Sequence, residues 1–196
     1  MKTTKNFALL SILFFTAFSF KANAQVDLTA SPVSLLFGDV NLGVDFKIKE
    51  NFSLGATAGY GRGDIWGLVD SRETVPVNLI GKYYFNPKHG ADGFYADAFA
   101  RYVHRNIQAT YKGGDADVET KIDFTRQQVG LGFGLGYKVV SQGGFVFDIG
   151  TGIGRALYSH DNVNVSEQDY KFPELFRTMG YFRIGLGYRF GGTNRE

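Results

Sequence analysis

Large apolar residues and glycines alternate without a break from Val129 to Tyr137. Every odd position is large and apolar, and every even position is glycine. Successive side chains of a strand point to opposite faces, so this segment predicts a strand with one apolar face and one nearly bare face. A soluble sheet carries polar side chains on its exposed face. A narrow membrane barrel instead has lipid outside and small or polar residues inside, and the pattern favours that architecture.

Similar alternation recurs along the chain and predicts eight strands in total. The weakest is Val26–Leu36, where Pro32 interrupts the alternation, and we expect a bulge or a bend there. No segment after residue 24 shows helical periodicity over more than two turns. The eight predicted strands are 26–36, 40–48, 52–60, 75–85, 94–105, 124–139, 145–158 and 178–190.

The connectors between these segments alternate in length. Short ones cover 49–51, 86–93 and 141–144, and long polar ones cover 61–74, 106–123 and 159–177. Outer-membrane barrels have short periplasmic turns and long outer loops. With a tight turn near Gly38-Asp39, both ends of the mature chain lie in the periplasm. The predicted fold is therefore all-β: an eight-stranded antiparallel up-and-down transmembrane β-barrel.

The first 24 residues have the features of a secretory signal peptide. Lys2 and Lys5 precede a 14-residue apolar stretch, and Ala22-Asn23-Ala24 is a small-x-small cleavage site. The apolar stretch is shorter than the ~20 residues of a membrane-spanning helix. We therefore expect residues 1–24 to be removed and residues 25–196 to form one outer-membrane β-barrel domain.

Composition excludes several function classes. Without the lysines at 2, 5 and 21, the chain has 18 basic and 19 acidic residues, so no basic balance argues for nucleic acid. The absence of cysteine excludes disulfides, thiolate metal sites and thiol catalysis.

Charged residues alternate into the predicted lumen, where two interpretations are open. An internal salt-bridge network would hold the barrel shut, whereas a connected path would conduct protons or ions. An eight-stranded interior is normally filled by its own side chains, which favours the network, and it favours packing relief over ligand space as the reason for the glycines. The alternation predicts Lys82 opposite Asp97, and Asp148 level with Lys138 and Arg189. The inward charges are Asp45, Lys47, Lys82, Asp97, Arg101, Lys138, Asp148, Arg183 and Arg189.

Outward aromatic residues cluster at the two ends of the strands. Two aromatic rings flanking an aliphatic band are typical of membrane interfaces. The ring at the short-turn end is Phe46, Phe52, Tyr83, Phe85, Phe94, Tyr137, Phe145, Tyr188 and Phe190, and the ring at the long-loop end is Tyr60, Tyr102, Tyr158 and Phe182.

The last strand carries a pattern that resembles a known assembly signal. The segment Arg183–Phe190 resembles the terminal-strand signal that the outer-membrane insertion machinery recognises, although six residues follow Phe190. Together with the strand pattern, the chain resembles the small OmpA/OmpX-like outer-membrane β-barrels, in particular the Bacteroidetes-type family of unknown function. This resemblance implies a monomeric barrel without established catalysis. Its implied partners are outer-membrane lipids, lipopolysaccharide and the insertion machinery.

Candidate catalytic and metal sites are few. Barrels that modify lipid A combine His with Ser and a carboxylate, and Ser159-His160-Asp161, with Glu167 near it, has those residue types. Adjacent strand residues point apart, however, so Ser159 and His160 are not expected to pair. His104 is a second candidate, whereas His89 lies in a predicted periplasmic turn. We therefore expect no catalytic residues.

Two of the predicted outer loops carry residues that suggest binding. Asp115, Asp117 and Glu119 alternate in a glycine-rich loop, but the spacing is not that of a calcium-binding loop, so a solvated loop is predicted, with no metal or cofactor. Trp66, with Ile65 and Leu68, forms an apolar loop tip. It could contact lipopolysaccharide or a partner, or pack on the barrel rim.

Three function hypotheses follow. The leading one is a structural or surface-interaction protein whose barrel holds three outer loops. The second is a lipid A-modifying enzyme that uses His160 or His104. The third is a soluble periplasmic lipocalin-like binder, which would need an apolar interior and a charged exterior, the reverse of the pattern in this chain.

Overall fold

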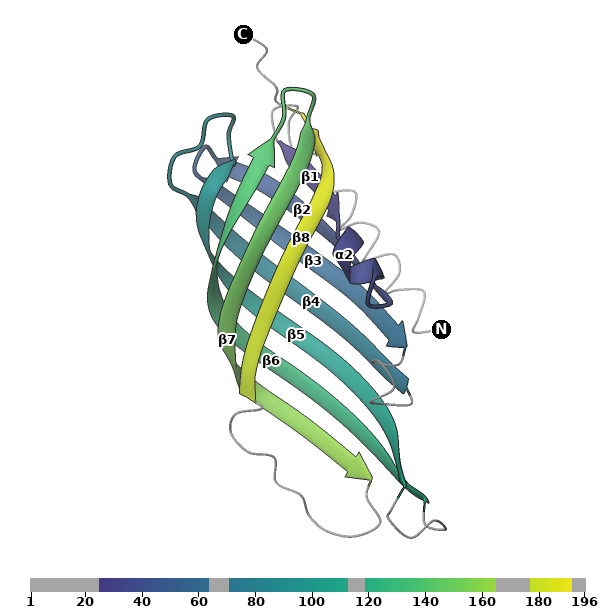
Figure 1. The fold of residues 1–196 in the computed structure, drawn as a ribbon. Helices are drawn as coiled ribbons and strands as arrows, with labels where there is room; N and C mark the ends of the chain where they lie inside the picture. The colour runs from purple at the N-terminus through teal and green to yellow at the C-terminus, as the bar shows by residue number, and fades with distance from the viewer. Residues whose placement is uncertain (1–24, 64–70, 113–118, 165–176, 192–196) are drawn as a thin grey trace, which may run out of the picture.

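The chain folds into one closed barrel of eight antiparallel strands, each paired with its neighbours in the sequence (Figure 1). The computed structural model describes residues 25–63, 71–112, 119–164 and 177–191. The pairing of β1 with the last five residues of β8 closes the sheet at one end of the barrel. The strands are β1 Val26–Ala30, β2 Asp39–Lys49, β3 Phe52–Gly63, β4 Ser71–Tyr84, β5 Gly93–Lys112, β6 Glu119–Val140, β7 Phe145–Asn164 and β8 Thr178–Phe190. This confirms the predicted fold class.

The short turns lie together at one end of the barrel, the upper end in Figure 1. The first residue of β1, Val26, pairs with Phe46 near the end of β2 and with Phe190 at the end of β8. The beginning and the end of the barrel therefore lie at the short-turn end, as predicted. We call this the periplasmic end and the opposite one the outer end.

The first predicted strand is wrong in its second half. The strand β1 stops at Ala30, and Pro32–Leu35 forms the one-turn helix α2 with Pro32 in its first turn. Proline has no N–H to donate to a sheet, but it suits the start of a helix. The polypeptide then turns at Gly38, whose φ of 73° is a left-handed conformation, and enters β2.

The short β1 leaves part of β8 without a hydrogen-bonded neighbour on that side. β1 pairs only with the segment Leu186–Phe190, whereas β8 begins at Thr178. The helix α2 lies at this gap and contacts both β2 and β8. The Ser34 hydroxyl of α2 accepts a 2.8 Å hydrogen bond from Asn41 of β2, so α2 is tied to the barrel wall beside the gap.

Five strands extend further than predicted at the outer end, and the extension is longest in three of them. β5 continues to Lys112, β6 begins at Glu119 and β7 continues to Asn164, so much of the predicted loops 106–123 and 159–177 is paired strand. β3 also continues to Gly63, and β4 begins at Ser71. The β7 residues 159–162 are polar on both faces, so alternation does not mark that part of the strand, although the backbone ladder continues.

The predicted facing of the strands is confirmed. Apolar side chains on the outer wall are solvent-accessible in the isolated barrel, and Phe133 is 76% exposed. The outward aromatic residues are exposed at both strand ends, apart from half-buried Phe52. At the periplasmic end several touch, including Phe85 and Phe94, whose ring centroids are 5.6 Å apart. None of the described helices has the length and hydrophobicity needed to cross a membrane.

Candidate functional site: the barrel lumen

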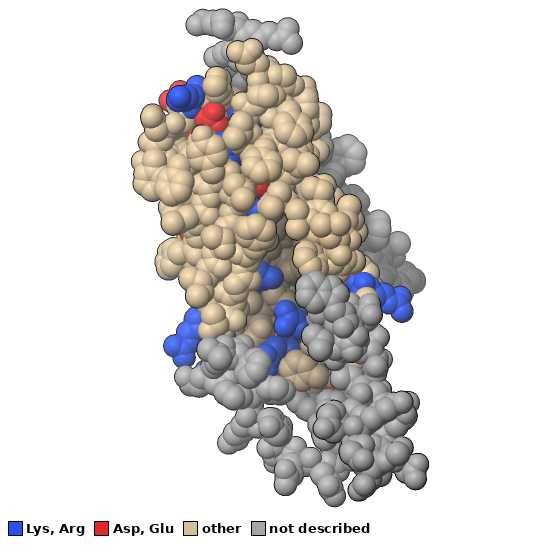
Figure 2. Space-filling model, viewed as in Figure 1, with Lys and Arg blue, Asp and Glu red and all other residues tan. Residues whose placement is uncertain are grey.

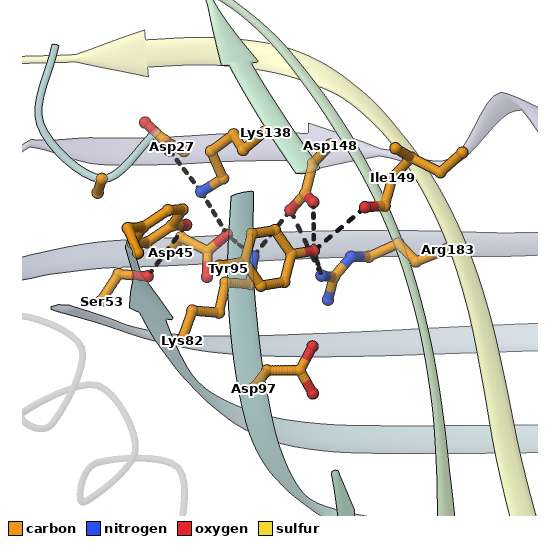
Figure 3. Close-up of polar contacts among 12 residues, drawn as sticks. Asp27, Asp45, Ser53, Lys82, Tyr95, Asp97, Lys138, Asp148, Ile149 and Arg183 are labelled. Atoms are coloured by element: carbon orange, nitrogen blue, oxygen red, sulfur yellow. Dashed lines mark hydrogen bonds and ion pairs between the residues drawn. The ribbon is translucent and has the colours of Figure 1, made fainter. Parts of the chain in front are cut away.

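The periplasmic half of the lumen is filled by a network of buried ion pairs (Figure 3). Lys82 of β4 is 1% exposed, and its Nζ lies 2.6 Å from Asp45 Oδ2 and 2.7 Å from Asp148 Oδ2. Lys138 of β6 lies 2.9 Å from Asp27 and 3.0 Å from Asp45 through its own Nζ. Each lysine therefore joins two carboxylates from different strands, and the pairs link β1, β2, β4, β6 and β7 across the lumen.

A tyrosine and an arginine extend this network towards the middle of the barrel. Tyr95 donates a 2.7 Å hydrogen bond to Asp148 and accepts a 2.6 Å bond from Arg183. Arg183 also lies 3.5 Å from Asp148. Buried charges are tolerated only when they are paired and hydrogen-bonded, and this chain of contacts meets that condition.

Arg189 closes the periplasmic end. Its guanidinium forms two bonds to Asp27, of 2.6 Å and 2.9 Å. It also donates to the carbonyls of His89, Gly90 and Ala91 in the turn between β4 and β5. This turn is therefore held over the periplasmic mouth, where Ala91 is buried against Tyr84 and Tyr95.

The glycines of β6 and β7 provide the space that bulky neighbours occupy. A Cβ atom on Gly134 would lie 2.6 Å from the Tyr181 hydroxyl, and one on Gly152 would lie 2.5 Å from Tyr181 Cε1. Tyr181 packs edge-on against Phe99, with centroids 4.9 Å apart. The glycine stripe thus gives packing relief, as predicted: two aromatic side chains from β5 and β8 fill the volume that it leaves.

The predicted inward charges lie where expected, but several partners differ. Lys82 is in register with Asp97, and Lys138 with Asp148, as predicted. Lys82 nevertheless binds Asp45 and Asp148, whereas Asp97 accepts a short hydrogen bond from Tyr181. Asp148 is in register with Gly185 of β8, four residues before Arg189, and Arg189 binds Asp27, so the expectation that Asp148 and Arg189 lie level is wrong.

Asp27 and Tyr181 are network residues that the sequence analysis missed. Asp27 lies in the weakly patterned first strand, and Tyr181 was not considered as a polar group. Alternation along the strand identifies both as inward-facing, because each stands next to an outward-facing apolar residue, Leu28 and Phe182 respectively.

The outer half of the lumen is rich in arginine. Arg101 and Arg105 of β5 face inward beside Thr74 and Asn78 of β4, with which they are in register. Arg72 begins the same face of β4 and forms an ion pair with Asp39. Figure 2 shows basic side chains gathered towards this end of the molecule. The inward position of Arg101 was predicted, but the cluster was not.

The Ser-His-Asp sequence of β7 does not form a catalytic arrangement. The Ser159 hydroxyl donates a 3.1 Å hydrogen bond to Asp161, which also accepts two 2.8 Å bonds from Arg126. His160 alternates to the other face of the strand. Glu167, Asp115, Asp117 and the Trp66 loop tip lie outside the described residues, and Glu119 is the first residue of β6.

The other two histidines are placed apart from this segment. His104 is in register with Gln127 on the outer wall of the barrel. His89 lies in the periplasmic turn and contacts Asp92 at 3.1 Å. Among the residues that the structure describes, no group of three or more His, Asp or Glu side chains could hold a metal ion.

Comparison with known proteins assigns the chain to a family. The model of a family described as the autotransporter beta-domain matches residues 15–149, more than half of the chain. The matched region runs from before β1 into β7. No curated protein and no solved structure matches the chain.

Proposed function

Because the chain belongs to the autotransporter β-domain family, a family of outer-membrane β-barrels, we propose that it is a closed barrel that holds its long connections at the cell surface. The outer-membrane location follows from the family and from the lipid-facing wall of the barrel. The structural or surface-interaction role is our inference. The observation that carries it is the ion-pair network that fills the periplasmic half of the lumen.

A filled lumen argues against a transport path. The name of the family refers to transport, but the lysine and carboxylate groups in the periplasmic half of the lumen are almost fully buried and bonded to one another. A path for ions would have to break several of these pairs at once. The connections are long at the outer end of the barrel and short at the periplasmic end. With the lumen filled, the long outer connections are the part of the molecule available for recognition.

Planar-bilayer conductance tests the closed lumen directly. The mature protein, inserted into a bilayer, is expected to show no steady conductance in simple salt. The same measurement on Lys82→Ala gives the conductance of a barrel whose network is broken, since this change removes the cation between Asp45 and Asp148. Steady, ion-selective conductance of the unchanged protein would overturn the closed barrel and favour the ion path.

We further propose that the barrel is not an enzyme. Ser159 is bonded to Asp161 and alternates away from His160, which leaves the serine without a histidine base in this segment. Mass spectra of lipid A from cells with and without the gene are expected to be identical. A mass difference that disappears with His160→Ala or His104→Ala would establish the enzymatic alternative.

The finer assignments belong to the same proposal. We infer an OmpA/OmpX-like barrel of the Bacteroidetes type, exported by the signal peptide at residues 1–24. Its partners would be outer-membrane lipids and lipopolysaccharide, and the insertion machinery would recognise Arg183–Phe190. Exposed Tyr188 and Phe190 in β8 support that recognition, with ring centroids 5.1 Å apart. The sheet is closed, and the part of β8 that β1 does not reach has the helix α2 beside it, which supports a monomer.

A further inference from the structure

The outer half of the lumen contains a cavity of about 290 Å³ on the outer side of the closing network. Residues of β1, β2, β3, β4, β5 and β8 line it, together with Ser31 and with Ser34 of α2. Its walls carry four arginines, Arg72, Arg101, Arg105 and Arg183, whereas Asp39 is the one carboxylate among the described lining residues. The cavity therefore has an excess of positive charge, whereas the network on its periplasmic side has nearly equal numbers of acidic and basic groups.

Two of these arginines have no carboxylate partner among the described residues. Arg101 donates a 2.6 Å hydrogen bond to the backbone carbonyl of Gly180. Arg105, four residues further out on the same face of β5, forms no side-chain hydrogen bond or ion pair within the described structure. Like charges held together in a partly buried space repel each other, so the cluster would be stabilised by an anion between the guanidinium groups.

Unsatisfied polar atoms are concentrated in the same cavity. Buried side-chain atoms without a hydrogen-bond partner in the described structure include Arg72 Nε, Thr74 Oγ1, Asn78 Oδ1 and Arg183 Nε, and all four residues line the cavity. Thr74 is only 8% exposed. Such atoms are rare in folded proteins, and a polar ligand in the cavity would supply the hydrogen bonds that these four lack within the protein.

The donor set identifies the chemistry of that partner. The Nε–H groups of Arg72 and Arg183 and the Thr74 hydroxyl can donate, and Asn78 Oδ1 can accept from a protonated oxygen. The guanidinium groups of Arg101 and Arg105 line the same cavity and add further donors. Planar guanidinium groups bind oxyanions through pairs of hydrogen bonds, and phosphate oxygens match this geometry. We propose that the outer lumen is a binding site for a phosphate-type oxyanion, held by Arg101 and Arg105 with Thr74 and Asn78.

The arginine cavity has a neighbour on the side of the barrel where β1 is short. A second cavity, of about 500 Å³, lies at the gap between β8 and α2. Ser34, Arg72 and Phe182 line both cavities, and Phe182 faces the lipid. A phosphate group carried by an outer-leaflet lipid and a free phosphate ion could therefore both occupy the arginine cluster.

Calorimetry on the whole barrel tests the proposal. The protein is held in an uncharged maltoside detergent, which contains no phosphate, and is titrated first with inorganic phosphate and then with short-chain phosphatidic acid. Saturable binding of at least one ligand is expected. Arg105→Gln should weaken it about tenfold or more, because a charge-assisted contact is lost.

The matched control is Arg155→Gln, which removes the same charge from the exposed outer wall of β7 and should leave binding unchanged. Heat-modifiable gel mobility reports whether each variant is folded. If inorganic phosphate binds and phosphatidic acid displaces it, the site takes a free oxyanion. If only phosphatidic acid binds, and its binding depends on Arg105, the site belongs to a lipid headgroup. If neither ligand binds, or if Arg105→Gln binds as the unchanged protein does, the proposal is wrong. The loop-holding role would survive that result, since it depends on the closed network and not on this cavity.

Discussion

Gly134 shows how one absent side chain shapes the lumen. It lies on the inner wall of β6, and the atoms nearest to a Cβ at this position would be Thr151 O, the Tyr181 hydroxyl and Asp97 Oδ1, at 2.6–2.7 Å. One of these neighbours is backbone and the other two are engaged with each other. None can move away cheaply, so the site tolerates no side chain.

Gly134→Leu is therefore expected to prevent assembly of the barrel. The added side chain would overlap the hydrogen-bonded pair of Tyr181 and Asp97, and overpacking of this kind has no relaxed solution in a closed sheet. Gel mobility with and without heating measures the folded fraction. The control is Gly180→Leu on β8, where the nearest atom to a Cβ would be Gly152 O at 3.6 Å and the new side chain would face lipid. Equal assembly of both variants would contradict the facing of β6.

Lys82→Ala is expected to lower the free energy of unfolding by about 3–5 kcal/mol, because Asp45 and Asp148 would remain buried without their shared cation. Urea titration of the barrel in lipid vesicles measures this change. Lys49→Ala removes an exposed lysine at the periplasmic end of β2 and should change stability by less than about 0.5 kcal/mol. A loss below 1 kcal/mol for Lys82→Ala would show that the network does not hold the barrel.

The facing of these residues was predictable from the sequence, but their partners were not. Alternation along one strand determines which side chains enter the lumen, and register places direct neighbours opposite each other. Lys82 instead reaches Asp148 of β7, which is not adjacent to β4. Contacts across a lumen depend on barrel diameter and tilt, which no local pattern encodes.

At the scale of the element, β6 separates its two environments most completely. Leu131, Phe133 and Leu135 are exposed on the outer wall, while the intervening glycines are covered by aromatic side chains of β5 and β8. The free-energy cost of a substitution on the outer wall should therefore depend on its depth in the membrane rather than on the packing of the lumen.

Leu135→Arg is expected to cost about 2–4 kcal/mol, because it places a cation in the middle of the lipid-facing band. Gln127→Arg introduces the same side chain on the same face of β6, beyond the outer aromatic residues, where the cost should be about 0–1 kcal/mol. Urea titrations in vesicles compare the two. Equal costs would mean that Gln127 and Leu135 do not differ in depth.

The first element shows where sequence reasoning stopped. Alternation before Pro32 correctly predicted a strand, and glycine at 38 correctly predicted a turn. The residues between them are apolar at consecutive positions, a pattern compatible with a strand or with one helical turn. The choice depends on the gap beside β8, which exists only in the assembled barrel. A second cavity lies at that gap and shares Ser34, Arg72 and Phe182 with the arginine cavity.

For the whole molecule, the lumen has two parts of different character. The periplasmic half has nearly balanced buried charges and is closed by the turn that Arg189 holds. The outer half has an excess of arginine and contains the cavity. A barrel with this asymmetry can accept an anion from outside without passing it through, which is consistent with a surface role and with the proposed oxyanion site.

This asymmetry depends on the orientation of the barrel, which cysteine labelling can measure. The chain contains no cysteine, so a single introduced thiol is a unique label site. Asn162→Cys lies exposed at the outer end of β7, and Gln142→Cys lies exposed in the turn between β6 and β7 at the periplasmic end. On intact cells, a membrane-impermeant maleimide should label Cys at 162 and should label Cys at 142 only after the outer membrane is permeabilised. The reverse result would turn the barrel over, place the arginine cavity towards the periplasm and exclude a surface role for the long connections.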